Sequence, residues 1–185
     1  MKHVKKAHRT RLTTGGAVVA LGLAGVGAYS ASAGGGQDAA PATVAEATSG
    51  HTTATTRLTV AAATRAARAA LDAAEAEDQR VTVAVVDRDG NPLVTLRGDG
   101  AGPQSPGSAE RKAYTAVAWN APTSVLAGRL AQAPNLKDVP GTLFLPGGTP
   151  VTAQGAPIAG IGVAGAPSGD LDEKFARAGA AALEK

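Results

Sequence analysis

The feature that most constrains the fold is a β-hairpin pattern over residues 81–100, VTVAVVDRDGNPLVTLRGDG. Two runs rich in β-branched residues flank the turn-forming stretch DRDGN, and runs of this kind joined by a short turn pair as antiparallel strands. Val81, Val83 and Val85 alternate along the first run and therefore share one face, and Pro92 stands near the start of the second run. The hairpin predicts an antiparallel sheet.

Helical patterns flank this hairpin on both sides. Residues 58–77 are rich in alanine, have apolar residues at helical spacing, and offer Thr59 as an N-cap. Further helices are predicted over residues 108–119, 123–132 and 168–185, the last with Ser168 or Asp170 as its N-cap.

Three more strands are predicted in the C-terminal half. TLFLPGG at 142–148 has the pattern of one strand, and residues 149–166 indicate a short strand, a turn at Gly155-Ala156 and a longer strand. The element order is then α-β-β-α-α-β-β-β-α, with the strands joined mainly by hairpins. This order indicates an α+β fold, a five-stranded antiparallel sheet flanked by helices.

The N-terminal region has the pattern of an export signal followed by a linker. Residues 1–33 contain five basic residues, then the apolar run AVVALGLAGVGA and the small-x-small site ASA, which predicts cleavage after Ala33 and a secreted protein. RTRLTTGG resembles a twin-arginine leader without adjacent arginines, so the export route stays open. A cytosolic chain with a basic tail is the alternative. Residues 34–56 lack periodicity and are predicted to be a disordered linker before a domain at 57–185.

The charge balance of the chain depends on this leader. The whole chain has 18 Lys+Arg and 15 Asp+Glu, but residues 1–33 hold five of the basic residues and none of the acidic ones. The remainder therefore has 13 basic and 15 acidic residues and a formal net charge of −2. Because the positive charge lies in the leader, we do not expect a nucleic-acid partner.

The residues that are missing exclude several chemistries. The chain has no cysteine, its one methionine is Met1, and its histidines are His3, His8 and His51. All three histidines precede the segment that we expect to fold. A Ser-His-Asp triad, a HExxH zinc site and a haem pocket with a proximal histidine are therefore excluded from the domain, unless His51 folds back onto it.

Two glycine-rich stretches resemble nucleotide-binding motifs. In the loop before residue 108, Pro103 and Pro106 lack amide hydrogens and separate the glycines from the helix, and there is no GxxxxGK[ST]. GIGVAG at 160–165 matches GxGxxG but lies within a predicted strand. We interpret its glycines as positions where a helix or another backbone packs closely on the sheet.

Two acidic pairs have the spacing of a weak cation site. Asp72 and Glu75 lie three residues apart on one helix face, and Asp170 and Glu173 repeat the spacing. Such a pair can bind a hard cation weakly. The alternative, which we favour, is a solvated helix face. Asp72 and Glu75 are the candidate metal ligands.

The predicted helix at 108–119 has a polar cluster at its centre. Arg111, Lys112, Tyr114 and Thr115 follow the glycine-rich loop within little more than one turn. Polar groups at the end of such a loop are typical of a ligand pocket. Solvent-exposed charges beside a half-buried tyrosine would give the same spacing, so both interpretations stay open.

Several stretches resemble the GlcG/HbpS-like family, which is also described as a haem-degrading domain and is related to the C-terminal module of PduO. They are VAVVDRDGNPLVTLRGDGAGPQSPGSAERKAYTAVAW, LPGGTPV and GAPIAGIGVAGAPSGDLDEKFARAGAAAL, and the similarity covers about residues 57–183. The resemblance implies a profilin-like α/β sandwich that assembles into a homo-oligomer, commonly an octamer.

The resemblance also implies haem as the cofactor and a role in haem or redox sensing with a membrane sensor kinase; some secreted members bind iron. KAYTA matches the family's helix motif, with Thr115 at the position linked to haem, and Asp99-Gly100 lies in the loop that matches the one beside that site. With Arg111, Lys112 and Tyr114, these residues form the candidate haem site.

The residues limit how haem could be held. Axial ligand candidates are Tyr114, Lys112 and His51 from the linker, and Thr115 would shape the pocket. We therefore predict an exported haem-binding and sensing protein that is not an enzyme. The alternatives are a haem-degrading or other small-molecule enzyme in the same pocket, and an oligomeric scaffold with a vestigial site.

Overall fold

The structure is a computed structural model that describes residues 45–184. The predicted export signal at 1–33 and the first part of the predicted linker lie outside these residues. Within the described part of the chain, no helix is both long enough and apolar enough to cross a bilayer.

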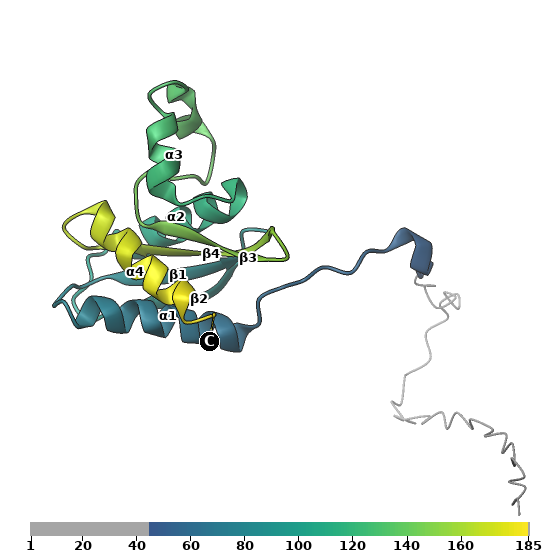
Figure 1. The fold of residues 1–185 in the computed structure, drawn as a ribbon, viewed down its shortest axis with the longest axis horizontal. Coiled ribbons are helices and arrows are strands. Elements are labelled where there is room, and N and C mark those ends of the chain that lie inside the picture. Colours follow the sequence, from purple (N-terminus) through teal and green to yellow (C-terminus); the bar gives the residue numbers. More distant parts are fainter. Residues whose placement is uncertain (1–44, 185) are drawn as a thin grey trace, which may run out of the picture. The chain divides into compact units, whose positions relative to one another are not determined.

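A four-stranded antiparallel sheet forms the centre of the domain (Figure 1). Its strands are β1 (Thr82–Asp87), β2 (Pro92–Arg97), β3 (Gly148–Ala153) and β4 (Ala156–Ala164), in the spatial order β2-β1-β4-β3. The predicted hairpin is confirmed as the β1–β2 pair, in which Val83 opposes Leu96 and Val85 opposes Val94. The α+β class and the antiparallel sheet are confirmed.

The prediction of a fifth strand at 142–148 is wrong. Only Gly148 of that segment belongs to a strand, and the residues before it have no regular structure. Pro146 has no N–H to donate to a sheet, and Gly147 has φ 131°, which interrupts an extended strand. The segment instead lies against a helix, and side chains of that helix bind its backbone.

The helices are α1 (Val60–Glu75), α2 (Ser105–Trp119), α3 (Thr123–Arg129) and α4 (Gly169–Ala181), with short 3-10 turns at Ser49–His51 and Pro134–Asp138. Both predicted N-caps are confirmed: the Thr59 hydroxyl accepts from the N–H of Ala62, and the Ser168 hydroxyl accepts from the N–H of Leu171. The α2 helix begins three residues before the predicted start, because Pro106 is tolerated in a first turn, where its missing N–H has no partner to lose.

The helices cover both faces of the sheet (Figure 1): α1 and α4 lie side by side on one face, and α2 covers the other. The α1/α4 face has large apolar side chains. Its fully buried members include Val81, Val83, Val85, Ile161, Val163 and Phe175, together with five alanines of α1. This face is therefore the main hydrophobic core.

On the α2 face of the sheet, there is almost no layer of side chains between the helix and β4. A Cβ atom at Gly160 or Gly162 of β4 would overlap the backbone carbonyl of Ala113 or Ala109 on α2. The helix backbone thus rests directly on the strand, as the interpretation of GIGVAG requires. Because α2 is so close to the sheet, its remaining side chains project sideways and outward, where they form the polar sites described next.

Candidate functional site

The predicted site residues of α2 point in different directions. Arg111 is exposed and Tyr114 is half-buried, whereas Lys112 and Thr115 are buried, with relative exposures of 4% and 0%. Neighbouring positions on a helix are about 100° apart, so one polar run supplies two separate surroundings. The four residues therefore do not line one pocket.

Arg111 and Tyr114 line an open hollow of about 280 Å³ at the end of the β1–β2 hairpin. The other lining residues are Val86, Gly90, Pro92, Glu110 and Gly141. The Tyr114 ring lies on the backbone of Gly90 and Gly141, which have φ of 88° and 79°. A Cβ atom at Gly90 would come within 2.6 Å of the ring, so this glycine makes room for Tyr114.

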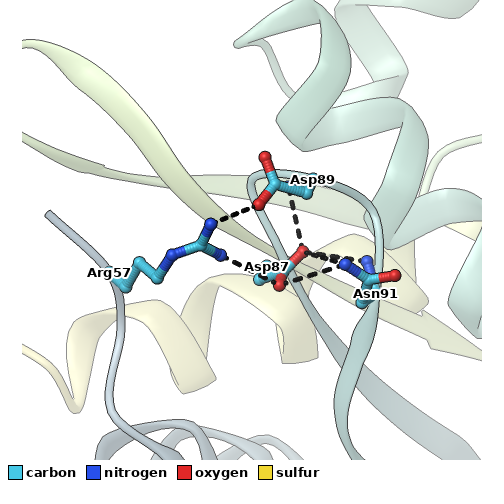
Figure 2. A network of polar contacts seen from close by, with 4 residues as sticks. All are labelled: Arg57, Asp87, Asp89 and Asn91. Atoms are coloured by element: carbon cyan, nitrogen blue, oxygen red, sulfur yellow. Dashed lines mark hydrogen bonds and ion pairs between the residues drawn. The ribbon is translucent and has the colours of Figure 1, made fainter. Parts of the chain in front are cut away.

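A polar network around Asp87 forms the hairpin turn beside this hollow (Figure 2). Asp87 Oδ1 accepts hydrogen bonds from the backbone N–H groups of Asp89 and Asn91, both at 2.9 Å. Arg57 Nη2 binds Asp89 Oδ2 at 2.6 Å, and Arg57 Nη1 lies 3.4 Å from Asp87 Oδ2. The turn is thus fixed from within by Asp87 and joined to the N-terminal segment by Arg57.

The network also sets the charge of Asp87. Burial acts to raise the pKa of this carboxyl, but the hydrogen-bond donors of the turn and the nearby Arg57 guanidinium outweigh burial and hold the pKa below its ordinary value. Asp87 is therefore a carboxylate at neutral pH. Sequence analysis did not predict this network, although an aspartate that ends a strand just before a turn is a known signal for side-chain bonds to turn amides.

Lys112 forms a buried ion pair on the other side of α2. Its Nζ lies 2.7 Å from Asp172 Oδ2 and 3.1 Å from the carbonyl oxygen of Val163, and both charged side chains are about 5% exposed. Asp172 Oδ1 accepts from the N–H of Ala166. Burial raises the pKa of Asp172, and the Lys112 ammonium only partly offsets this effect. Lys112 is thus occupied by Asp172, and it is not placed to ligate iron in the Tyr114 hollow.

Thr115 is also fully occupied within the protein. Its hydroxyl donates to the carbonyl of Arg111 and accepts from the N–H of Leu143, each at 2.7 Å. Arg111 Nη2 donates to the carbonyl of Thr142 at 2.9 Å. These bonds hold residues 142–145, part of the stretch that the sequence predicts as a strand, against α2. The segment directly follows Gly141, which lines the Tyr114 hollow.

Asp99 and Gly100 lie at a different place in the fold. Asp99 lines a hollow of about 380 Å³ together with Glu75, Asp78, Gln79 and Arg80, and Gly100 lies against the Arg80 side chain. The structure does not bring this loop to Tyr114.

The candidate metal ligands Asp72 and Glu75 share one cation, Arg68. Arg68 Nε lies 2.6 Å from Asp72 Oδ1, and Arg68 Nη2 lies 2.9 Å from Glu75 Oε2. All three side chains are about half exposed. Among residues 45–184 there is no group of three or more His, Cys, Asp or Glu side chains that could hold a metal ion.

In the second acidic pair, Asp170 faces solvent and Glu173 is buried. Asp170 is exposed, but Glu173 is 3% exposed, so its interpretation as part of a solvated face is wrong. Glu173 accepts from the backbone N–H and hydroxyl of Ser124, at 2.8 and 2.6 Å. Burial acts to raise the pKa of Glu173, but these donors outweigh it and the pKa lies below its ordinary value. Glu173 thus binds the first turn of α3 to α4.

The chemistry of the Tyr114 hollow is suited to one edge of haem. A tyrosine oxygen is a known haem ligand, Arg111 is a partner for a carboxylate such as a propionate, and Val86 and Pro92 offer apolar contact. The hollow is slightly smaller than the 300 Å³ or more of a typical small-molecule pocket, so it would enclose only part of a macrocycle.

A family model described as "Haem degrading protein HbpS-like" matches residues 58–181. The chain belongs to the HbpS-like family. The match covers every strand and α-helix of the domain, from two residues before α1 to the last residue of α4.

Solved structures of HbpS have the same fold. The structure of a double mutant of Streptomyces reticuli HbpS is 72% identical to this chain, with a TM-score of 0.76, and covers 77% of this chain and 97% of its own. A second HbpS structure is 74% identical, with a TM-score of 0.74, and covers 75% of this chain and 99% of its own.

A structure of a PduOC–haem complex is 27% identical, with a TM-score of 0.63, and covers 69% of this chain and 95% of its own. A search of curated protein sequences gave no significant match. The family and its structural neighbours support a haem-related function for this chain.

Proposed function

We propose that this protein binds haem reversibly, with the Tyr114 hollow as the part of the site that faces the iron. The proposal is carried by two observations together: the matching family model and a PduOC–haem neighbour both link the fold to haem, and one open hollow has a tyrosine oxygen and an arginine in its lining. When bound, haem would supply a redox-active iron. The chain's own residues would orient it: Tyr114 through its phenol oxygen, and Arg111 through a propionate.

The roles of the remaining predicted residues follow from their contacts. Thr115 supports the site by holding the 142–145 segment against α2. Lys112 supports it from the opposite side of the helix, through the buried pair with Asp172. Both are therefore positioning residues in this proposal, and neither is assigned a bond to iron.

Titration of the full chain with hemin tests the proposal. We expect a saturating shift of the Soret band in the wild type and a weaker or spectrally altered complex for Tyr114→Phe. Thr115→Ala should weaken binding through the displaced segment, and Thr115→Ser, which keeps the hydroxyl, is its matched control. An unchanged titration in Tyr114→Phe would remove Tyr114 from the site, and no Soret shift in the wild type would overturn haem binding.

Haem degradation is the second candidate function, because the matching family model is described by that activity. It would use the same hollow. Incubation of the hemin complex with a reductant and oxygen separates the two functions. Loss of the Soret band with release of iron would favour degradation, and a stable band would favour binding alone.

Export, assembly and signalling belong to the same proposal. The leader pattern at 1–33 supports secretion, and the family resemblance supports a homo-oligomer, iron binding and a sensor-kinase partner. Asp72 and Glu75, the candidate metal ligands from helix spacing, would have to exchange Arg68 for the metal ion. An oligomer would also explain how a hollow of about 280 Å³ could serve a larger ligand, since a second copy would cover the exposed part. Sedimentation of the protein with and without hemin tests this point.

A further inference from the structure

The Tyr114 hollow is short of iron ligands. Residues 52–184 contain no histidine, cysteine or methionine. Two polar side chains next to Tyr114 on α2 are already bonded within the protein: Lys112 is bound to Asp172, and Thr115 is bound to Arg111 and Leu143. Of the two side chains of the hollow that carry oxygens, Glu110 accepts a hydrogen bond at Oε1 from the Thr95 hydroxyl at 3.1 Å, and the Tyr114 oxygen makes none to another described residue. An imidazole, thiolate or thioether ligand for iron must therefore come from outside the hollow.

The N-terminal segment is joined to the wall of this hollow. Arg57 binds Asp89 Oδ2 at 2.6 Å, Asp89 precedes Gly90 in the chain, and Gly90 lies under the Tyr114 ring. Figure 2 shows the Arg57 guanidinium reaching across from the segment before α1 to the hairpin turn. A chain of direct contacts therefore runs from Arg57 to the Tyr114 ring.

His51 lies six residues before this anchor. Residues 52–58 are in neither helix nor strand, and nearly all of them are exposed. Between His51 and Arg57, the one side-chain bond is from the Thr52 hydroxyl to the carbonyl of Ser49, and it leads away from the domain. Six extended residues span about 20 Å, roughly two thirds of the diameter of a small domain of about 30 Å. His51 can thus reach the hollow without any change in the fold.

Imidazole is a common protein ligand of haem iron. His51 is exposed, and its Nδ1 makes a single contact, with the exposed Thr48 hydroxyl at 3.3 Å. This contact is weak enough to be exchanged for a bond to a metal. The imidazole is therefore available, unlike the Lys112 ammonium.

We propose that His51 is an iron ligand of haem bound in the Tyr114 hollow, and that the ion pairs of Arg57 with Asp87 and Asp89 anchor the linker so that His51 stays within reach. This proposal rests on the proposed function. It assigns the linker a part in the site and makes Arg57 a positioning residue.

The experiment uses the full chain with His3→Ala and His8→Ala, so that His51 is the single histidine. Ferric hemin is added, and the absorption and electron paramagnetic resonance spectra are recorded with and without His51→Ala. We expect His51→Ala to lower the affinity about tenfold or more and to change the spin-state signature. Added imidazole should restore the original spectrum, and Thr53→Ala, an exposed neighbour, should leave spectrum and affinity unchanged.

Loss of the anchor should have a smaller effect of the same kind. Arg57→Gln moves the first fixed point after His51 from Arg57, six residues along the chain, to Val60 at the start of α1, nine residues along. The local concentration of His51 at the hollow should then fall about twofold. Asp89→Asn should act as Arg57→Gln does, because it removes the 2.6 Å bond and leaves Asp87 to hold the turn.

Two results would overturn the proposal in distinguishable ways. If the parent chain binds hemin and His51→Ala has the same spectrum and affinity, the linker ligand is disproved and haem binding stands. If the parent chain binds no hemin, the proposed function and the linker ligand fail together.

Discussion

The two sides of α2 differ in how completely their polar groups are bonded. On one side, Lys112 and Asp172 are about 5% exposed, and the ammonium and carboxylate are bonded to each other and to the backbone. On the other side, Arg111 is exposed, and the Tyr114 oxygen has no hydrogen bond among the described residues. The closed side is built for stability, and the open side has bonding capacity left for a ligand.

The difference arises from the way α2 rests on β4. Gly160 and Gly162 let the helix backbone touch the strand, so α2 has hardly any room for side chains beneath it. Its polar residues are displaced to the two flanks. One flank meets Asp172 in the first turn of α4 and forms a buried ion pair. The other flank meets the hairpin turn and remains open.

Lys112→Met should have the largest effect, because it leaves Asp172 buried without a counter-charge. We expect a loss of about 3–5 kcal/mol in the free energy of unfolding. Urea unfolding measures this loss. Lys174→Met, which breaks an exposed ion pair with Glu77, is the control and should cost about 1 kcal/mol or less. Equal losses for the two substitutions would contradict the claim that the buried Lys112–Asp172 pair stabilises the fold more than an exposed pair does.

Gly162→Ala tests the contact that separates the two flanks. Its methyl group would overlap the carbonyl of Ala109, so we expect a loss of about 1–3 kcal/mol in unfolding free energy. Gly107→Ala in the first turn of α2 is the control: nothing lies within 4 Å of its Cβ position, and the change should be neutral or stabilising. An unchanged free energy of unfolding in Gly162→Ala would show that the helix can move away from the sheet at no cost.

Thr115→Ala tests the buried hydroxyl that holds the 142–145 segment. It leaves the N–H of Leu143 without its partner, at a cost of about 1–2 kcal/mol in unfolding free energy. Thr115→Ser should recover most of this loss. If alanine and serine are equally stable, the hydroxyl does not hold the segment.

Acid unfolding tests the Asp87 network beside the open side. The pKa of Asp87 is lowered in the folded protein, so its stabilising contribution is present above the unfolded-state pKa of about 4 and is lost as pH falls through the folded-state value. The unfolding free energy of Asp87→Asn should therefore decline less steeply below about pH 4 than that of the wild type. Asp138→Asn, an exposed substitution, is the control. Parallel pH profiles would contradict the role of Asp87.

Tyr114→Phe should have the smallest effect on stability. The hydroxyl makes no hydrogen bond among the described residues, so the unfolding free energy should change by about 0.5 kcal/mol or less. The hemin titration should change clearly. A large loss of stability with unchanged titration would reverse the contrast between the two flanks of α2.

Local patterns predicted most of the fold. The β1–β2 hairpin, the helix N-caps Thr59 and Ser168 and the close packing at GIGVAG depend on residues near in sequence, and each is confirmed. The segment at 142–148 was wrongly predicted as a strand, because its composition fits one. Its real partners, Thr115 and Arg111, lie some thirty residues earlier in the chain and gave no local signal.

The site divides in the same way. The sequence by itself determined that haem could not be held by a histidine, cysteine or methionine of the domain, and it located the polar run on α2, since both follow from residue types and spacing. Only the tertiary structure decided that Lys112 and Glu173 are buried partners of other groups, and that Asp99 lies apart from Tyr114. The physical reason is that a polar side chain is buried and hydrogen-bonded only where other parts of the chain pack against it. Those parts are distant in sequence, so the residue's neighbours in the chain do not reveal them.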